Sequence, residues 1–253
     1  MLLVIDNLSH SFGGLAALTN ISIVVPEHQL LGIIGPNGSG KTTLFNLITG
    51  MYRASSGSIR LKGQELVGRA PAAITRMAVA RTFQNIRLFK TLSVLDNVRI
   101  ARYGKAACGP FDTLFRTGRF LKEEGLIIDQ AMELLTLFEL DRYVEAPAGS
   151  LPYGQQRQLE FARALATDPV LLLLDEPAAG MNPYEVGKLN EQLQWVAKRF
   201  ALTIILIEHH MGLVMEVCQR VVVLDFGVVI AEGTPEEVRN DPRVIDVYLG
   251  KGS

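Results

Sequence analysis

The sequence predicts an α/β fold: a mainly parallel sheet with an antiparallel β part at the N-terminus and a helical subdomain inserted between strands. Three observations predict it. Short, continuous apolar runs such as residues 201–207 have the length of parallel strands that are covered on both faces. A glycine-rich loop joins an apolar run at residues 30–34 to a helical pattern. Apolar residues three and four positions apart recur within residues 88–168.

The N-terminal third alternates β-type and helical patterns. Two short β-type runs, residues 2–4 and 21–25, flank a separating segment at residues 9–14, and residues 56–63 form a third strand that ends at a glycine turn. Between them, residues 42–51 form a helix that stops at Gly50. The apolar face of that helix consists of Leu44, Leu47 and Ile48.

The middle of the chain lacks strong strand signals. One helical face there comprises Ile127, Ile128, Ala131, Leu134, Leu135 and Phe138. The turn-rich residues 103–118 are expected to form a loop. We therefore expect one domain over residues 1–253, with a core at 1–87 and 169–253 and a helical subdomain at about 88–168.

The last third returns to strands and helices. Strands are expected at residues 170–175 and 203–207, and a hairpin over 220–231 that turns at residues 225–227. Asn182 and Glu185 form a capping-box pattern around Pro183, which predicts the start of a helix. Its apolar face comprises Val186, Leu189, Leu193, Val196 and Phe200. A terminal helix is expected to open at Pro235.

Composition excludes several classes. Although 48% of the 253 residues are hydrophobic, no apolar run reaches the 18 or more residues of a membrane-spanning helix. The N-terminus lacks the basic region and cleavage site of a secretion signal, so we expect a cytoplasmic protein. Cys108 and Cys218 form no CxxC pair, which argues against a zinc site. A net charge of −1 gives no overall basic field for nucleic acid.

Residues 35–42 match the phosphate-loop spacing G-x-x-x-x-G-K-[ST]. Glycines let successive backbone N–H groups point into one concavity, where the positive end of the following helix also attracts anions. Lys41 adds a mobile cation for the outer phosphates, and the Thr42 hydroxyl is left to bind Mg²⁺. The predicted nucleotide-binding residues here are Gly35, Pro36, Asn37, Gly38, Ser39, Gly40, Lys41, Thr42 and Thr43.

Two carboxylates, Asp175 and Glu176, follow four leucines, at the strand end where open α/β sheets bind ligands. Asp175 is suited to coordinate Mg²⁺. Glu176 can orient or deprotonate a water molecule for attack on the γ-phosphate. The alternative is a solvated turn at the end of a strand. His209 also ends a strand, although a lone histidine is more often structural.

Taken in order, these features resemble the nucleotide-binding subunit of ABC transporters, whose core is the RecA-like fold of P-loop NTPases. The resemblance rests on the phosphate loop, Gln84, the segment 151–155 (LPYGQ), residues 171–176 and His209, and it covers nearly the whole chain. It implies that ATP and Mg²⁺ are bound.

The resemblance also implies residue roles. Phe12 would stack on adenine, although by spacing alone it reads as a core or edge aromatic residue. Gln84 would touch Mg²⁺ and couple the core to the helical subdomain, and Asp175 would bind the metal. Glu176 would be the general base, and His209 would contact the γ-phosphate and hold the attacking water.

The long segment between residues 88 and 149 is similar to the longer of the two ATPase subunits of branched-chain amino-acid importers. Longer motif matches are similar to the ATPase subunits of the same importers. They comprise residues 81–89, 153–160, 175–183 and 232–238. Branched-chain amino acids are therefore the expected solute. An importer for another solute, such as an amide or urea, is the alternative, because other chains read the solute.

The chain departs from the family in two places. Pro152 and Tyr153 replace the serine and first glycine of the usual L-S-G-G-Q signature, which contacts ATP held by the opposite subunit. Proline offers neither hydroxyl nor N–H, so Tyr153, Gly154 and Gln155 are expected to make a working but weaker contact in trans. His210 stands where an aspartate is usual.

The resemblance implies a cycle in which two such domains sandwich two ATP molecules and reopen after hydrolysis. Implied partners are transmembrane permease subunits docking near residues 84–91, a second ATP-binding subunit that is identical or different, and indirectly a solute-binding protein. The chain would lie peripherally on the cytoplasmic face of the cell membrane.

Two rival functions share the phosphate loop. A P-loop kinase would not need Glu176 or the segment 153–155, and a phosphoryl-acceptor assay separates it from an ATPase. A soluble ABC-type ATPase acting on DNA or ribosomes usually carries paired domains, coiled coils or zinc modules, which this sequence lacks. Salt-dependent binding to nucleic acid would favour that rival.

Overall fold

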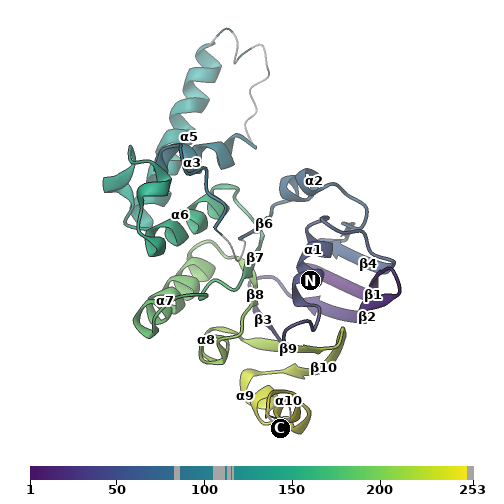
Figure 1. The fold of residues 1–253 in the computed structure, drawn as a ribbon. Coiled ribbons are helices and arrows are strands. Elements are labelled where there is room, and N and C mark those ends of the chain that lie inside the picture. Colours follow the sequence, from purple (N-terminus) through teal and green to yellow (C-terminus); the bar gives the residue numbers. More distant parts are fainter. Residues whose placement is uncertain (83–85, 105–111, 113–114, 116, 250–253) are drawn as a thin grey trace. The chain divides into compact units, whose positions relative to one another are not determined.

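The computed structural model of the protein describes residues 1–82, 86–104, 112, 115 and 117–249. Its chain forms two compact units (Figure 1). We call residues Met1–Arg81 with Val170–Ser253 the core unit, and residues Thr82–Pro169 the helical unit. The sequence placed the corresponding boundaries at about residues 88 and 168.

A six-stranded sheet forms the centre of the core unit (Figure 1). Its strand order is β10 (Val228–Gly233), β9 (Arg220–Asp225), β3 (Leu30–Ile34), β8 (Thr203–Ile207), β7 (Leu171–Asp175) and β6 (Val79–Arg81). The strands from β9 to β6 are parallel, and β10 returns antiparallel to β9. Every residue of β3, β7 and β8 is buried, which explains their continuous apolar sequences.

The N-terminal antiparallel sheet has the order β2 (Leu15–Val25), β1 (Leu3–Phe12), β4 (Ser56–Leu61) and β5 (Gln64–Glu65). The expected separation of two short runs by residues 9–14 was wrong, because β1 extends through Phe12 and β2 begins at Leu15. Register shifts interrupt the β1–β2 pairing, and Asn7 and Asn20 have positive φ angles. These bulges break the two-residue alternation that sequence patterns detect.

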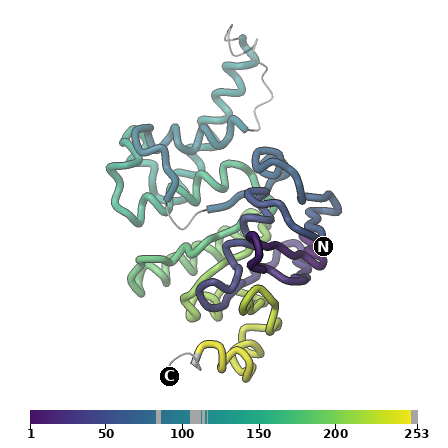
Figure 2. The backbone as a smooth tube through the Cα atoms, turned by 45° about the vertical axis from the view of Figure 1, so that its right-hand side comes forward, coloured from purple at the N-terminus to yellow at the C-terminus, as the bar shows by residue number. Residues whose placement is uncertain are grey.

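Helix α1 (Lys41–Ile48) supplies Leu44, Phe45, Leu47 and Ile48 to one buried cluster with strands of both sheets. The other helices of the core unit are α2 (Pro71–Arg76), α7 (Pro183–Arg199), α8 (Met211–Val217), α9 (Pro235–Arg239) and α10 (Pro242–Leu249). Helix α7 begins with the predicted capping box of Asn182 and Glu185. Helices α9 and α10 follow β10 and pack together at the C-terminal end of the chain (Figure 2). The short elements β5, β6, α2 and α8 and the second terminal helix were not predicted.

Helix α8 packs closely on strand β3 at Gly32. A Cβ atom at Gly32 would lie 2.8 Å from Val214 Cγ1 and 3.0 Å from Cys218 Sγ. Both neighbours are buried, so neither can move aside cheaply. Glycine at this position therefore permits the contact between the sheet and α8.

The helical unit consists mainly of α3 (Val94–Tyr103), α5 (Gly118–Leu137) and α6 (Tyr153–Ala166), with short 3-10 turns at Asp141–Tyr143 and Ala148–Ser150. The three helices contact one another, and α5 buries Ile127, Ala131, Leu134 and Leu135. Buried Asn97 fixes the segment before α3 by bonding both backbone groups of Phe89. Most of the loop expected at residues 103–118 lies outside the described residues. Among the described residues, no helix combines the length and apolar character needed to cross a bilayer.

The contact at Gly32 gives a stability prediction. We expect Gly32→Ala to lower the free energy of unfolding by about 1–3 kcal/mol, because the added methyl group overpacks the interface with α8. Gly187→Ala is the matched control, since nothing lies within 4 Å of a Cβ at this exposed position in α7. That substitution should stabilise the protein by about 0.5–1 kcal/mol. Urea unfolding of both variants measures the difference, and equal effects would contradict the proposed packing.

Candidate functional site

The chemically active residues of the core unit follow the carboxyl ends of neighbouring parallel strands. The phosphate-loop segment 35–42 follows β3, Asp175 ends β7, and Glu208 and His209 follow β8. Parallel register places these ends on one edge of the sheet: Ile33 pairs with Ile207, and Asp175 also pairs with Ile207. The fold thus brings together residues that are about 140 positions apart in the sequence.

The segment 35–42 bends tightly as it leaves β3. Gly35 has a φ of 147°, and a Cβ atom there would lie 2.0 Å from the Leu224 carbonyl oxygen. No larger residue fits without moving β9. The hairpin tip that follows β9 also holds the loop, because the Gly227 N–H donates to the Ser39 carbonyl at 3.1 Å.

Helix α1 begins at Lys41, directly after the loop, and no side chain caps its N-terminus. The first N–H groups of a helix have no partner within the helix and carry its positive dipole end. The uncapped start of α1 is therefore suited to an anionic group, and it faces the same cavity as the loop.

Lys41 is buried beneath the loop. Its Nζ atom donates to the Gly35 carbonyl at 2.7 Å, the Pro36 carbonyl at 2.8 Å and the Ser39 hydroxyl at 3.4 Å. Burial lowers the pKa of Lys41, while the charges of Glu176 and Asp175 act in the opposite direction. A phosphate entering the cavity would replace neutral carbonyl partners by anionic ones, which stabilises the protonated ammonium group.

The two carboxylates, Asp175 and Glu176, lie in different environments. Asp175 is 4% exposed and forms an ion pair with Arg81 at 2.7 Å. Glu176 adopts a left-handed φ of 48° and turns its Oε1 atom to His209 Nε2 at 2.9 Å. An ionised carboxylate only accepts hydrogen bonds, so with an ionised Glu176 this contact requires a histidine form that carries a proton on Nε2. The solvated turn considered for both carboxylates does not describe Asp175.

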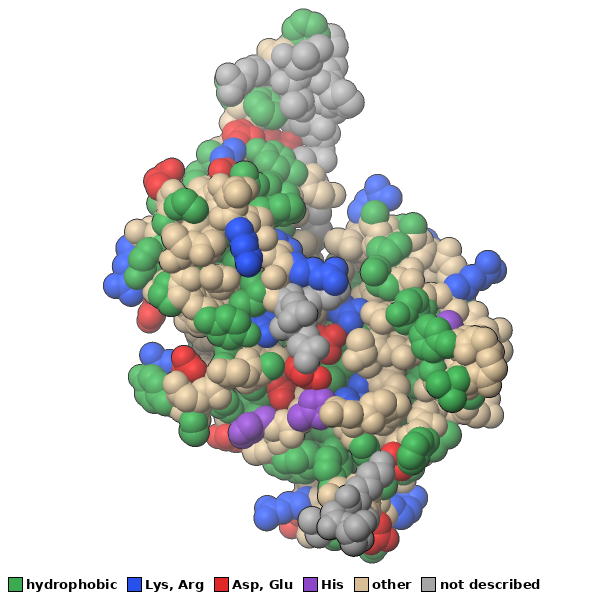
Figure 3. Space-filling model, in the orientation of Figure 1, with side chains coloured by type: hydrophobic (Ala, Val, Ile, Leu, Met, Phe, Trp, Pro, Cys, Tyr) green, Lys and Arg blue, Asp and Glu red, His purple; other side chains and the backbone are tan. Residues whose placement is uncertain are grey.

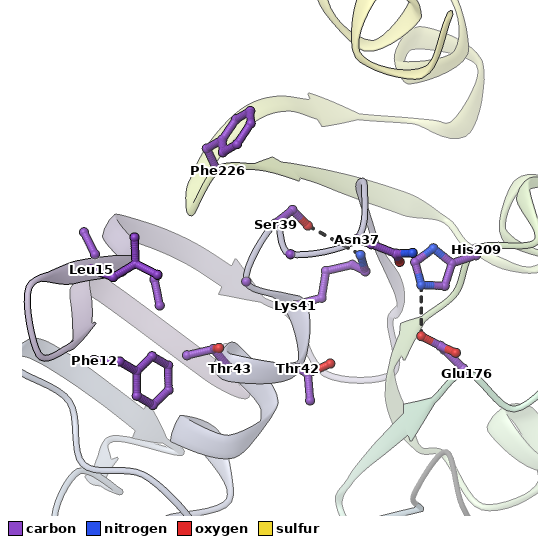
Figure 4. Close-up of a pocket in the computed structure, with 14 residues that line it drawn as sticks. Phe12, Leu15, Asn37, Ser39, Lys41, Thr42, Thr43, Glu176, His209 and Phe226 are labelled. Atoms are coloured by element: carbon purple, nitrogen blue, oxygen red, sulfur yellow. Dashed lines mark hydrogen bonds and ion pairs between the residues drawn. The ribbon is translucent and has the colours of Figure 1, made fainter. Parts of the chain in front are cut away.

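Glu176 and His209 line a cavity of about 560 Å³ together with the phosphate loop. Figure 4 shows Lys41 and Thr42 between an apolar side with Phe12 and Leu15 and a polar side with Glu176 and His209. On the face shown in Figure 3, acidic and histidine side chains adjoin one another. Predicted residues that line the cavity are Phe12, Asn37, Gly38, Ser39, Gly40, Lys41, Thr42, Thr43, Glu176 and His209.

The apolar side of the cavity is built from aromatic and aliphatic residues. Phe12 is 46% exposed, and its ring forms T-shaped contacts with His10 and Tyr52 at centroid distances of 4.6 and 5.3 Å. Leu15 and Phe226 also line this side. An exposed ring held by two aromatic neighbours is a platform on which a flat base can stack.

Other predicted site residues lie elsewhere. Gly35 and Pro36 do not line the cavity, and their carbonyl groups accept hydrogen bonds from Lys41. Asp175 is next in sequence to the cavity residue Glu176 but does not line the cavity either. Gln84 lies outside the described residues. The signature residues belong to the helical unit, where Tyr153 opens α6, Gly154 follows it and Gln155 donates to the Tyr143 hydroxyl at 3.2 Å.

Sequence patterns missed Glu208 and Arg81 as residues of this site, and they singled out His210 without giving it a role. Glu208 is 3% exposed and accepts from the N–H groups of Ala178, His209 and His210 at 2.7–3.1 Å, which fixes the turn after β8. His210 caps α8 through its Nδ1 atom, the task an aspartate would perform there. Arg81 pairs with Asp175 across 94 positions. Neither Glu208 nor Arg81 has a local sequence signal, although Glu208 directly follows a buried strand.

Two of the oxygen donors predicted to bind a cation are the Thr42 hydroxyl, which lines the cavity, and the Asp175 carboxylate, which is next in sequence to the cavity residue Glu176. Among the described residues, no group of three or more His, Cys, Asp or Glu side chains could hold a metal by itself. Mg²⁺ commonly binds through one or two protein oxygens together with substrate phosphates. The donor set fits a cation that arrives with a phosphorylated ligand.

Comparison with known proteins agrees with this geometry. The family model described as ABC transporter matches residues 18–179, and the model described as branched-chain amino acid ATP-binding cassette transporter matches residues 228–253. The high-affinity branched-chain amino acid transport ATP-binding protein LivG of Salmonella typhimurium is 42% identical, covering 99% of this chain and 98% of its own. The corresponding protein BraF of Pseudomonas aeruginosa is 41% identical over the same shares.

Solved structures show the same fold. The ADP conformation of MJ1267, an ATP-binding cassette of an ABC transporter, is 32% identical with a TM-score of 0.85, covering 98% of each chain. The cbiO1 protein from Clostridium perfringens, part of the ABC transporter complex cbiONQ, is 26% identical with a TM-score of 0.81, covering 99% of this chain and 96% of its own. By sequence and by fold, this chain belongs to the ABC transporter family and is one of its ATP-binding cassettes.

Proposed function

We propose that this chain binds and hydrolyses ATP as an energising subunit of an importer for branched-chain amino acids. One observation carries the proposal: the phosphate loop, Lys41, Glu176 and His209 line a single cavity of about 560 Å³. The solute rests on the relatives, which are transport proteins for branched-chain amino acids, and on the match of residues 228–253.

The cavity suits an extended ligand with a flat base at one end and a triphosphate at the other. The base stacks on Phe12, and the triphosphate follows residues 35–42 to the N-terminus of α1. Lys41 then exchanges its carbonyl partners for the outer phosphate oxygens. Each such charge-assisted hydrogen bond is stronger than the neutral one it replaces.

Hydrolysis needs a water placed in line with the terminal phosphate and a base beside it. Glu176 is the residue we assign as base, because its carboxylate lines the cavity. His209 holds that carboxylate through the 2.9 Å hydrogen bond and contacts the terminal phosphate. Mg²⁺, held by Thr42, Asp175 and Gln84, would neutralise charge on the phosphates when bound.

We further propose that the two units act as one nucleotide-binding domain that pairs with a second ATP-binding subunit. Tyr153, Gly154 and Gln155 would contact the nucleotide of that partner. The uncapped N-terminus of α6 supports this role, since a 14-residue helix offers an anion its dipole end. Permease subunits, and through them a solute-binding protein, are the remaining partners, with the chain held peripherally at the cytoplasmic face of the membrane.

The first prediction from this proposed function concerns the base. Glu176→Gln should lower the rate of ATP hydrolysis about 10²–10⁴-fold, because an amide cannot take the proton from water. Binding of ATP, measured by calorimetry, should stay within about threefold, as no phosphate contact is removed. Glu191→Gln, at an exposed position of α7, is the matched control and should hydrolyse ATP normally. Hydrolysis near the parent rate in Glu176→Gln would place the base elsewhere.

The second prediction concerns the buried cation. Lys41→Ala removes an ammonium group with three oxygen partners and should weaken ATP binding about 10–100-fold, the range for hydrogen bonds to a charged group. Lys198→Ala changes the same residue type at an exposed position of α7 and should bind ATP as the parent does. Undiminished affinity in Lys41→Ala would contradict the assignment of the phosphate loop.

The third prediction concerns the solute. Deletion of the gene from its own organism should lower uptake of radiolabelled leucine, isoleucine and valine, and the parent gene should restore it. A gene carrying Glu176→Gln should not restore uptake, because transport then lacks its energy source. Normal uptake of these three amino acids with lost uptake of an amide or urea would assign the alternative solute.

A further inference from the structure

Arg81 joins the helix after the phosphate loop to the strand that carries Asp175. It is the last residue of β6. Its Nη2 atom donates to Asp175 Oδ2 at 2.7 Å, and its Nη1 atom donates to Asn46 Oδ1, also at 2.7 Å. The guanidinium carbon lies 5.4 Å from the centre of the Phe45 ring. Asn46 and Phe45 belong to α1, so one side chain bridges α1 and β7.

The bridge is buried. The side chains of Arg81 and Asp175 are 6% and 5% exposed. A buried carboxylate needs a charged or hydrogen-bonding partner, and its orientation follows that partner. Arginine suits this position, because its rigid planar fork can bond two elements in fixed directions. A lysine would offer a single flexible point charge instead.

The bridge reaches two of the three protein oxygen donors that we assign to the cation, Asp175 and Thr42. Asp175 is bonded directly. Thr42 lies four residues before Asn46 on α1, and residues spaced by four share one face of a helix. The Arg81 side chain therefore fixes the distance between the element that presents the Thr42 hydroxyl and the carboxylate of Asp175.

We propose that Arg81 is a positioning residue that orients the Asp175 carboxylate for the metal ion of a metal–nucleotide complex. The inference rests on the proposed function. Arg81 occupies Oδ2, and a carboxylate has about four lone-pair directions, so the same group can bond Arg81 and a cation together. Groups that orient metal-binding side chains typically change metal affinity 10–100-fold when removed.

Repulsion between the guanidinium group and the cation acts in the opposite direction. A carboxylate that bonds Arg81 and also holds the cation would screen this repulsion, and the triphosphate would add several negative charges that attract the cation. If Arg81 were removed, the Asp175 carboxylate could rotate toward other hydrogen-bond donors. Its oxygen atoms would then no longer be fixed in the orientation that binds the metal. We therefore expect Arg81 to strengthen metal binding.

Calorimetric titration with the ATP analogue adenylyl imidodiphosphate tests this role without hydrolysis. Affinity is measured with Mg²⁺ and again in EDTA, and the ratio of the two gives the coupling between metal and nucleotide. In Arg81→Met this ratio should fall at least tenfold, while the affinity in EDTA changes less than threefold. Arg81→Lys should recover part of the loss. Arg60→Met, at an exposed position on β4 in the same unit, should match the parent.

Asn46→Ala provides a second variant that keeps the ion pair and removes the hydrogen bond from Arg81 to Asn46 on α1, while the contact with Phe45 remains. It should lower the same ratio about threefold or more, which decides the question if Arg81→Met fails to fold. A ratio within twofold of the parent in the Arg81 and Asn46 variants would overturn the inference. So would equal losses with and without metal, which indicate a purely structural role. Failure of the parent to bind the analogue at all would instead contradict the proposed function.

Discussion

The parallel register of β3, β8 and β7 is the constraint on which the site depends. Pairing of Ile207 with both Ile33 and Asp175 sets the ends of three strands level. The phosphate loop, the acidic pair and the turn with Glu208 and His209 then meet at one edge of the sheet. Since all residues of these strands are buried, a shift in register would expose apolar side chains, and packing of the core keeps the site assembled.

In the structure, each charged side chain of this site is bonded to another group of the protein. Lys41 donates hydrogen bonds to backbone carbonyls, Asp175 forms an ion pair with Arg81, and Glu176 is hydrogen-bonded to His209. Each partner satisfies a group that would otherwise be costly to bury. The partners of Lys41 are neutral and exchangeable, whereas the Arg81–Asp175 pair is buried and bridges two elements. This difference separates the groups that we expect to move on nucleotide binding from those that hold the site in place.

The sequence predicted those features of the structure that depend on residues close together in the chain. The capping box at Asn182, the buried strands and the glycine turn at residues 35–42 each follow from adjacent residues, and the structure contains all three. The full length of β1 and β2 could not be read, because bulges near Asn7 and Asn20 interrupt the alternation. Arg81 was not identified, since its role depends on pairing with a strand 94 positions away. The short helix α8 has a histidine cap, which sequence rules for helix starts do not include.

The most direct test of the account is a crystal structure of the Glu176→Gln variant with ATP and Mg²⁺. We expect the triphosphate to lie along residues 35–42, with Lys41 Nζ moved from the Gly35 and Pro36 carbonyls to phosphate oxygens. Residue 176 should then lie one water molecule away from the terminal phosphorus. A nucleotide bound outside this loop, or a terminal phosphate distant from residues 175 and 176, would contradict the account.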